Sequence, residues 1–85
     1  MSEKKYKFIT IKYDKRYGLY HGKPVYEIIN NKTKNYLGSL TYYPAYGEFV
    51  FSSCEGKVFA VYCLKNIIDF MEEINEFRWW DREDN

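Results

Sequence analysis

The alternation of apolar and polar positions predicts β-strands in the first half of the chain. Residues 5–13 are rich in β-branched and aromatic side chains and contain neither glycine nor proline, so we expect a strand there. Residues 14–23 interrupt the alternation, and Gly18 and Gly22 supply turn conformations that other residues adopt only at a cost. This second segment therefore predicts a loop or an irregular hairpin.

The middle of the chain predicts an antiparallel meander. Proline is acceptable at the start of a strand, so we expect a strand over residues 24–30. The polar cluster at 30–35 is typical of a hairpin connection, and the return strand is expected over 36–43. Residues 44–47 predict a second turn, which leads into a strand over 48–52.

An amphipathic helix is predicted near the C-terminus, beginning close to Tyr62. Residues 58–60 are too few to classify and are either a short strand or the approach to this helix. Helical spacing gathers one apolar stripe, made of Leu64, Ile67, Ile68, Met71 and Ile74. The opposite side carries Lys65, Asp69, Glu72, Glu73 and Glu76, which we expect to be exposed.

Strands followed by one helix predict an α+β domain. The economical packing is an antiparallel meander sheet of four or five strands, with the C-terminal amphipathic helix laid across one face. With 85 residues the chain suffices for one domain and not two. We expect this domain to occupy residues 1–78 and residues 79–85 to form a frayed tail.

Aromatic residues make up 21% of the chain, more than a core of this size can hide, so several are expected on a surface. Five of them cluster around the turn at 44–47: Tyr42, Tyr43, Tyr46, Phe49 and Phe51. Core packing is the favoured interpretation for the two phenylalanines. For the three tyrosines, packing at the sheet edge and contact with a partner remain equal alternatives.

The loop at 14–23 is a candidate binding loop because it interleaves cations with tyrosines. Its candidate partner-binding residues are Lys15, Arg16, Tyr17, Tyr20 and Lys23. Cations meet phosphates and aromatic rings stack on unpaired bases, so the loop suits single-stranded nucleic acid, and it also suits an acidic protein surface. A solvated hairpin without a ligand is the alternative.

The charge is divided unevenly along the chain. Residues 1–42 hold nine Lys or Arg and three acids, a net +6, whereas residues 43–85 hold four and nine, a net −5. Such polarity can steer a partner or promote self-association, although exposed charges often serve only to solvate a surface.

Catalysis and metal binding are not expected. His21 is the only histidine, no nucleophile motif accompanies it, and Cys54 and Cys63 lack the paired spacing of a zinc site. We therefore expect no enzyme activity, no cofactor and no metal, with both thiols free. No signal peptide or apolar membrane span is recognisable, which favours a cytoplasmic location.

Four stretches carry a resemblance to a family: 26–32, 37–44, 49–51 and 63–71. They place Leu-Gly in a second strand, an aromatic-Pro turn, a Phe-rich strand and Cys-Leu at a helix start. In this pattern the chain resembles a group of small uncharacterised proteins of bacteriophages and other mobile elements. That group often has tryptophan where this chain has Tyr43 and Tyr46, and serine where it has Ala60.

The resemblance implies no catalytic residues, and it implies a protein that acts by binding a host protein or defence complex. We therefore expect a non-enzymatic protein-binding module, an anti-CRISPR-like inhibitor that works stoichiometrically. The alternative is a small protein that binds single-stranded nucleic acid through five residues in and beside the loop at 14–23: Tyr13, Arg16, Tyr17, Tyr20 and Lys23. A homodimer is compatible with either function.

Overall fold

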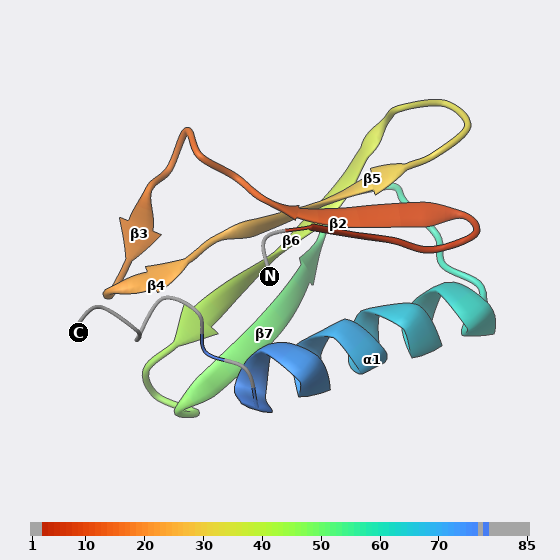
Figure 1. Cartoon of the computed structure of the whole chain (residues 1–85). Helices are drawn as coiled ribbons and strands as arrows, with labels where there is room; N and C mark the ends of the chain where they lie inside the picture. The colour runs from red at the N-terminus through yellow and green to blue at the C-terminus, as the bar shows by residue number, and fades with distance from the viewer. Residues whose placement is uncertain (1–2, 77, 79–85) are drawn as a thin grey trace.

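The computed structural model describes residues 3–76 and 78, and its centre is a five-stranded antiparallel sheet with the strand order β1-β2-β5-β6-β7. Helix α1 (Val61–Glu76) lies against one side of this sheet, as Figure 1 shows. The expected α+β class and meander are thus confirmed. The five strands are β1 (Glu3–Lys5), β2 (Ile9–Tyr13), β5 (Tyr26–Asn30), β6 (Tyr36–Tyr43) and β7 (Glu48–Ser53).

The segment predicted as one strand over residues 5–13 folds back on itself, so that prediction is wrong. The amide of Tyr6 donates to the carbonyl of Ile9 at 2.8 Å and closes a tight turn between β1 and β2. No glycine or proline marks the turn. Asn31, from the distant β5–β6 connection, holds it by donating through Nδ2 to the carbonyl of Tyr6 at 2.8 Å. The turn therefore depends on a tertiary contact.

The segment at 14–23 is an irregular hairpin, as predicted. It contains a second, two-stranded sheet made of β3 (Leu19–Tyr20) and β4 (Lys23–Pro24), which lies between β2 and β5 in the sequence. Gly18 and Gly22 both have positive φ angles, 64° and 75°. Figure 1 shows this hairpin projecting at one end of the large sheet.

Strand β6 has the predicted bounds, and it pairs with β7 over six consecutive residue pairs, from Gly38 with Ser53 to Tyr43 with Glu48. Gly38 is buried at this contact. A Cβ atom at Gly38 would collide with the backbone oxygen of Ser52. The glycine therefore permits close approach of the two strands.

The core lies between the sheet and α1. Tyr26 of β5 and Phe70 of the helix are both fully buried, and their rings meet edge to face with centroids 4.9 Å apart. The buried core residues are Ile9, Ile11, Tyr26, Ile28, Leu40, Phe49, Ile67, Phe70 and Ile74.

The predicted apolar stripe of the helix is displaced from the true one. Phe70 lies at its centre with Ile67 and Ile74, whereas Leu64 and Ile68 are 39% and 53% exposed. The large ring of Phe70 fits against Tyr26, and the helix is rotated to bury it. Leu64 and Ile68 consequently lie on the outer flank.

All the acids of the helix were expected to be exposed, but Glu73 is partly buried. Lys4 of β1 donates to Glu73 at 3.0 Å, and the hydroxyl of Tyr6 donates to Asp69 at 2.9 Å. The hydrogen bond to Glu73 raises the pKa of Lys4. Burial, followed by the bond to Asp69, raises the pKa of Tyr6. Part of the charge asymmetry is therefore satisfied within the molecule.

The remaining expectations concern the connection to the helix and the end of the chain. Residues 58–60 form no strand and lead directly into the helix. Among the residues that the structure describes, no helix is long and apolar enough to cross a membrane. The predicted tail, 79–85, lies outside the described residues, and the proposed domain boundary at 78 stays a prediction.

Candidate functional site

One face of the large sheet faces away from the helix. Because side chains alternate between the faces of a strand, the positions that flank the core residue Leu40 point to this open face. Ser39 and Thr41 are such positions in β6, as are Glu27 in β5 and Ser52 in β7. Together with the segment at 14–23, these strands form two adjoining pockets.

The first pocket has a volume of about 370 Å³ and no charged side chain in its lining. The loop contributes aromatic and aliphatic side chains, and the strands contribute hydroxyl groups. Tyr17, Leu19 and Tyr20 are 70%, 56% and 50% exposed. The lining residues are Tyr17, Leu19, Tyr20, Val25, Tyr36, Ser39, Thr41 and Ser52.

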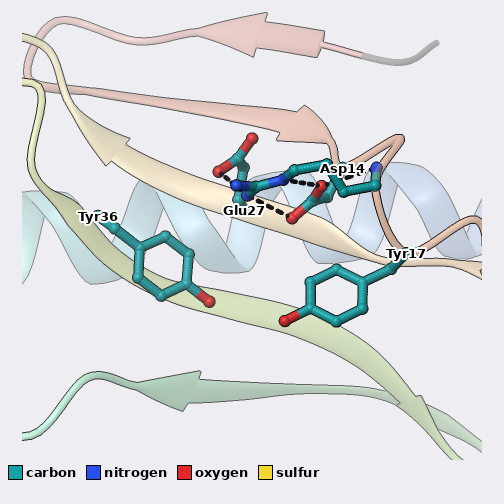
Figure 2. Close-up of a pocket in the computed structure, with 5 residues that line it drawn as sticks. Asp14, Tyr17, Glu27 and Tyr36 are labelled. Carbon is teal, nitrogen blue, oxygen red and sulfur yellow. Dashed lines mark hydrogen bonds and ion pairs between the residues drawn. The ribbon is translucent and has the colours of Figure 1, made fainter.

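The second pocket has a volume of about 420 Å³ and shares Tyr17 and Tyr36 with the first. Its other lining residues are Asp14, Arg16 and Glu27. Figure 2 shows the hydroxyl groups of Tyr17 and Tyr36 pointing toward each other across this pocket. The two tyrosines thus separate an uncharged compartment from a charged one, and we call the two pockets together the open-face groove.

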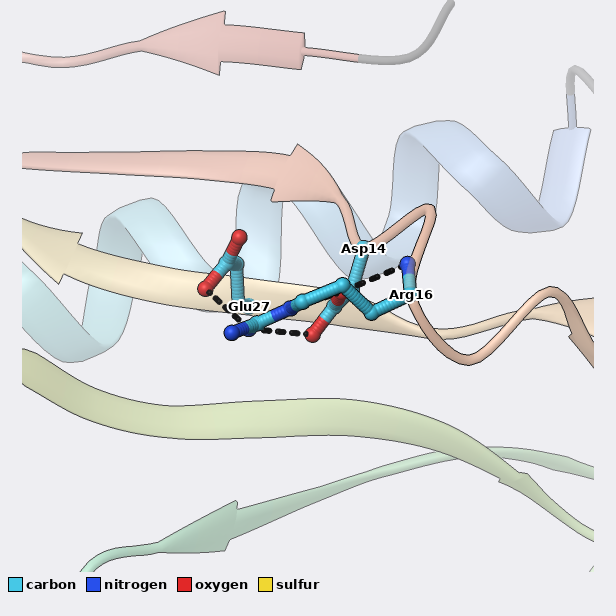
Figure 3. Close-up of polar contacts among 3 residues, drawn as sticks. All are labelled: Asp14, Arg16 and Glu27. Carbon is cyan, nitrogen blue, oxygen red and sulfur yellow. Dashed lines mark hydrogen bonds and ion pairs between the residues drawn. The ribbon is translucent and has the colours of Figure 1, made fainter.

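An ion-pair cluster forms the charged end of the groove. Arg16 donates to both oxygens of Asp14 at 2.9 Å and to Glu27 at 3.3 Å (Figure 3). The backbone amide of Arg16 donates to Asp14 Oδ1 at 3.1 Å. Asp14 is 3% exposed, so its carboxylate depends on these bonds, whereas the Arg16 side chain is 75% exposed.

The same cluster shifts two pKa values and orders the loop. The side-chain hydrogen bond from Arg16 holds the pKa of Asp14 below its usual range, although burial opposes the shift. The bond to Asp14 in turn raises the pKa of Arg16. Because the amide of Tyr17 also donates to the carbonyl of Asp14 at 3.2 Å, the cluster places Tyr17 beside the groove.

The predicted binding loop differs from expectation in the state of its cations. Arg16 is engaged by two carboxylates, and the ammonium of Lys23 lies 5.0 Å from the ring centroid of Tyr42. Lys15 is exposed. Tyr17, Tyr20 and Arg16 all line the open-face groove, so the structure brings these three predicted residues together. Lys15 does not line the groove; it lines a neighbouring pocket that shares Asp14, Arg16 and Glu27 with it.

The predicted aromatic cluster is divided between the two faces of the sheet. Phe49 is buried, as expected, and Tyr42 packs edge to face against it at 5.8 Å. Phe51 is half-buried against the ring of Phe59.

Two tyrosines of that cluster, Tyr43 and Tyr46, remain accessible to solvent. Tyr43 and Tyr46 are 46% and 70% exposed, and their rings meet edge to face with centroids 4.8 Å apart. Ser39, Thr41 and Tyr43 occupy every second position of β6 and therefore share one face of the sheet. Tyr43 thus extends the open face toward the β6–β7 turn.

Sequence reasoning missed part of the groove lining. Leu19, Val25 and Tyr36 were not singled out, nor were the hydroxyl residues Ser39, Thr41 and Ser52. The alternation of Ser39 and Thr41 around the core residue Leu40 is the signal that could have found the sheet contribution. No sequence pattern indicated that the hairpin at 14–23 would lie beside these strands.

The remaining candidates for site chemistry are metal-binding clusters and the two cysteines. Among the described residues there is no group of three or more His, Cys, Asp or Glu side chains that could hold a metal ion. Cys54 and Cys63 are free thiols. Comparison of the chain with protein-family models, curated proteins and solved structures finds no match.

Proposed function

We propose that this protein is a non-catalytic binding module that holds a segment of a partner protein in the open-face groove. The observation that carries the proposal is the group of loop side chains Tyr17, Leu19 and Tyr20, which stay at least half exposed around a concave, uncharged pocket. Tyrosine offers large contact area and loses little rotamer freedom on binding, which is why it is common at interface centres.

Hydroxyl groups add a polar element to the groove. Ser39 and Ser52 line the floor as a pair across β6 and β7, and Thr41 lies two residues further along β6. Each hydroxyl can donate or accept a hydrogen bond, so the floor suits the backbone of an extended peptide. Aromatic walls and a hydrogen-bonding floor together favour a peptide segment over a small metabolite.

The charges of the groove argue against a nucleic-acid ligand. Phosphate contacts need available cations, and Arg16 is already paired with Asp14 and Glu27. A phosphate near this arginine would also lie beside two carboxylates. The alternative single-stranded nucleic-acid function is therefore the less favoured one, and it becomes an outcome of the experiment below.

The biological role that we propose is stoichiometric inhibition of a host protein. This part rests on the resemblance of the stretches 26–32, 37–44, 49–51 and 63–71 to small proteins of bacteriophages and mobile elements, and on the expectation from the sequence that no residue is catalytic. In this role the groove binds a segment that the host protein needs for its own assembly or activity.

Affinity purification with matched variants tests the proposal. Tagged wild-type protein and the double variant Tyr17→Ser/Tyr36→Ser are incubated with lysate, treated with nuclease and washed at high salt. Tyr62→Ser, on the helix side, is the control because Tyr62 is 52% exposed and distant from the groove lining. We expect one protein retained by the wild type and the control and lost by the double variant.

Two other results would contradict the proposal. A protein retained equally by the double variant would show that the groove is not the binding site. Nucleic acid recovered in place of protein, and removed by nuclease or high salt, would favour the alternative function.

A further inference from the structure

Two turns meet at the end of the large sheet that lies opposite the β3–β4 hairpin, as Figure 1 shows. One is the turn between β1 and β2 at residues 6–8, and the other is the β5–β6 connection at residues 30–35. Asn31 joins them, because its backbone amide donates to the carbonyl of Phe8 at 2.9 Å and its Nδ2 donates to the carbonyl of Tyr6 at 2.8 Å. We call these two joined turns the sheet tip.

The sheet tip holds a pocket of about 320 Å³, which lies within the usual size range of small-molecule sites. Both turns contribute to its lining, which consists of Lys7, Phe8, Asn30, Asn31, Lys32 and Thr33. None of these residues lines the open-face groove. The tip pocket is therefore a separate candidate site.

Three side chains of the lining can donate hydrogen bonds to a ligand. In the part of the chain that the structure describes, Lys7 and Lys32 form no ion pair, so both ammonium groups keep their donors. The Lys7 ammonium lies 5.3 Å from the ring centroid of Phe8, which also lines the pocket. Thr33 Oγ1 accepts a hydrogen bond from the amide of Asn35 at 3.2 Å, so its own hydroxyl proton remains available.

The side-chain acceptors of the lining are, by contrast, already occupied. Asn30 Oδ1 accepts hydrogen bonds from the amides two and three residues further along the chain, at 2.8 and 2.9 Å. This arrangement also fixes the conformation of the β5–β6 connection. Asn31 Oδ1 accepts a hydrogen bond from the hydroxyl of Thr10. Neither turn contains an aspartate or a glutamate, so the pocket favours a ligand that brings acceptors and negative charge.

The sheet tip also carries positive charge that no ion pair among the described residues neutralises. Lys4 and Arg16 belong to the same basic half of the chain, and both are paired with carboxylates. The lysines of the tip have no carboxylate within ion-pair distance; they are Lys7, Lys32 and Lys34. Cations gathered in this way produce a positive potential that attracts an anion.

We propose that the tip pocket binds a phosphate group, as inorganic phosphate or as the phosphate monoester of a small molecule. A phosphate monoester carries close to two negative charges at neutral pH and three acceptor oxygens, which match two ammonium groups and one hydroxyl. A carboxylate or a nucleic-acid phosphodiester carries one charge and would leave one ammonium group unmatched. The inference does not depend on the function proposed for the open-face groove, because the two sites share no residue.

Titration followed by amide chemical shifts tests this inference, at low salt in a buffer free of phosphate. The probes are inorganic phosphate, glycerol phosphate, acetate and a single-stranded oligodeoxythymidine without a terminal phosphate. The two phosphates should produce saturable shifts of the amides at residues 7–8 and 30–33. Acetate should bind about tenfold more weakly or less, since it has half the charge. Equal affinity for the two phosphates would identify the group itself as the ligand, and tighter binding of the ester would identify a small phosphorylated molecule.

Matched double variants locate the binding site. Lys7→Ala/Lys32→Ala should weaken phosphate binding about tenfold or more, because both charged donors are removed. Lys12→Ala/Lys15→Ala is the control, since it removes the same net charge from residues that line a different pocket. The control should change the affinity by about twofold at most. Circular dichroism should be unchanged in both variants, because all four lysines are exposed.

Three results would overturn the inference. Neither phosphate could give saturable shifts at the sheet tip. The two double variants could weaken binding equally, which would show that net charge and not the pocket attracts the anion. The oligodeoxythymidine could bind more tightly than both phosphates, which would make the sheet tip a nucleic-acid surface.

Discussion

Asp14 shows how one buried carboxylate can organise a surface. It accepts three hydrogen bonds from Arg16, one from the backbone amide and two from the guanidinium. Its own amide donates to the carbonyl of Val25 at 2.8 Å, which ties the start of the loop to the strand that follows. The position of Tyr17 beside the groove therefore depends on a residue that a partner would scarcely touch.

Replacing Asp14 by alanine should destabilise the protein at neutral pH by about 1.5–3 kcal/mol, the usual loss for hydrogen bonds to a charged group. The measurement is urea unfolding, with Lys15→Ala as the control because Lys15 is exposed. The Asp14→Ala variant should also bind the partner more weakly, since Tyr17 loses its support.

The loss should depend on pH in a defined direction. The folded pKa of Asp14 is lowered by Arg16, so its contribution is fully present above the unfolded value of about 3.9 and is lost as pH falls through the folded value. The difference between wild type and Asp14→Ala should thus shrink in acid. A difference that stayed constant from neutral pH to strong acid would show that the ionised carboxylate is not what stabilises the loop.

At the scale of elements, the β6–β7 pair and the helix follow different rules. The pair is specified by local alternation together with one glycine at which two backbones come close. The helix is specified by its period, but its rotation about its own axis is set by the ring of Phe70 against Tyr26.

Replacing Gly38 by alanine should destabilise the sheet by about 1–3 kcal/mol, the range for a methyl group forced into a packed site. The added carbon would meet the backbone of Ser52, which cannot move aside as a flexible side chain could. The matched control is Ser39→Ala in the same strand, which should change the unfolding free energy by about 0.5 kcal/mol or less. Equal effects of the two substitutions would contradict the close approach.

At the scale of the whole molecule, contacts between the two ends of the chain close the structure. Lys4 and Glu73 are 69 residues apart and form a hydrogen-bonded ion pair at 3.0 Å. The bond from Tyr6 to Asp69 spans 63 residues. These contacts hold the three-residue edge strand β1 against the helix.

Replacing Lys4 by alanine should change the global unfolding free energy only slightly, because solvent screens an ion pair whose side chains are 34% and 35% exposed. Hydrogen exchange should reveal a local effect, with faster exchange for amides of β1 and unchanged exchange in β5 and β6. Lys5→Ala, at the exposed neighbouring position, is the control. Uniform acceleration across the whole sheet would contradict a local role for this contact.

Much of the fold could be predicted from local pattern alone. The strand at Tyr36–Tyr43, the turn after it and the helix beginning near residue 61 follow from alternation, turn residues and helical period. These features depend on neighbours within a few positions in the chain. The segment at 14–23 was likewise found as a candidate site, because its composition differs from that of the strands around it.

Three features were decided only by the tertiary structure. The hydrogen bond from Asn31 to the carbonyl of Tyr6 holds a turn in a segment that has no glycine or proline. The contact of Phe70 with Tyr26 sets the rotation of the helix about its own axis. Glu27, eleven positions from Arg16, completes the ion-pair cluster that neutralises a predicted phosphate-binding cation. In each case the local pattern did not specify the outcome, and a contact with another part of the chain did. Sequence alone thus determined the helix, the β6–β7 hairpin and the α+β class of this protein, whereas long-range contacts determined where the first strand turns and which side chains are available to bind.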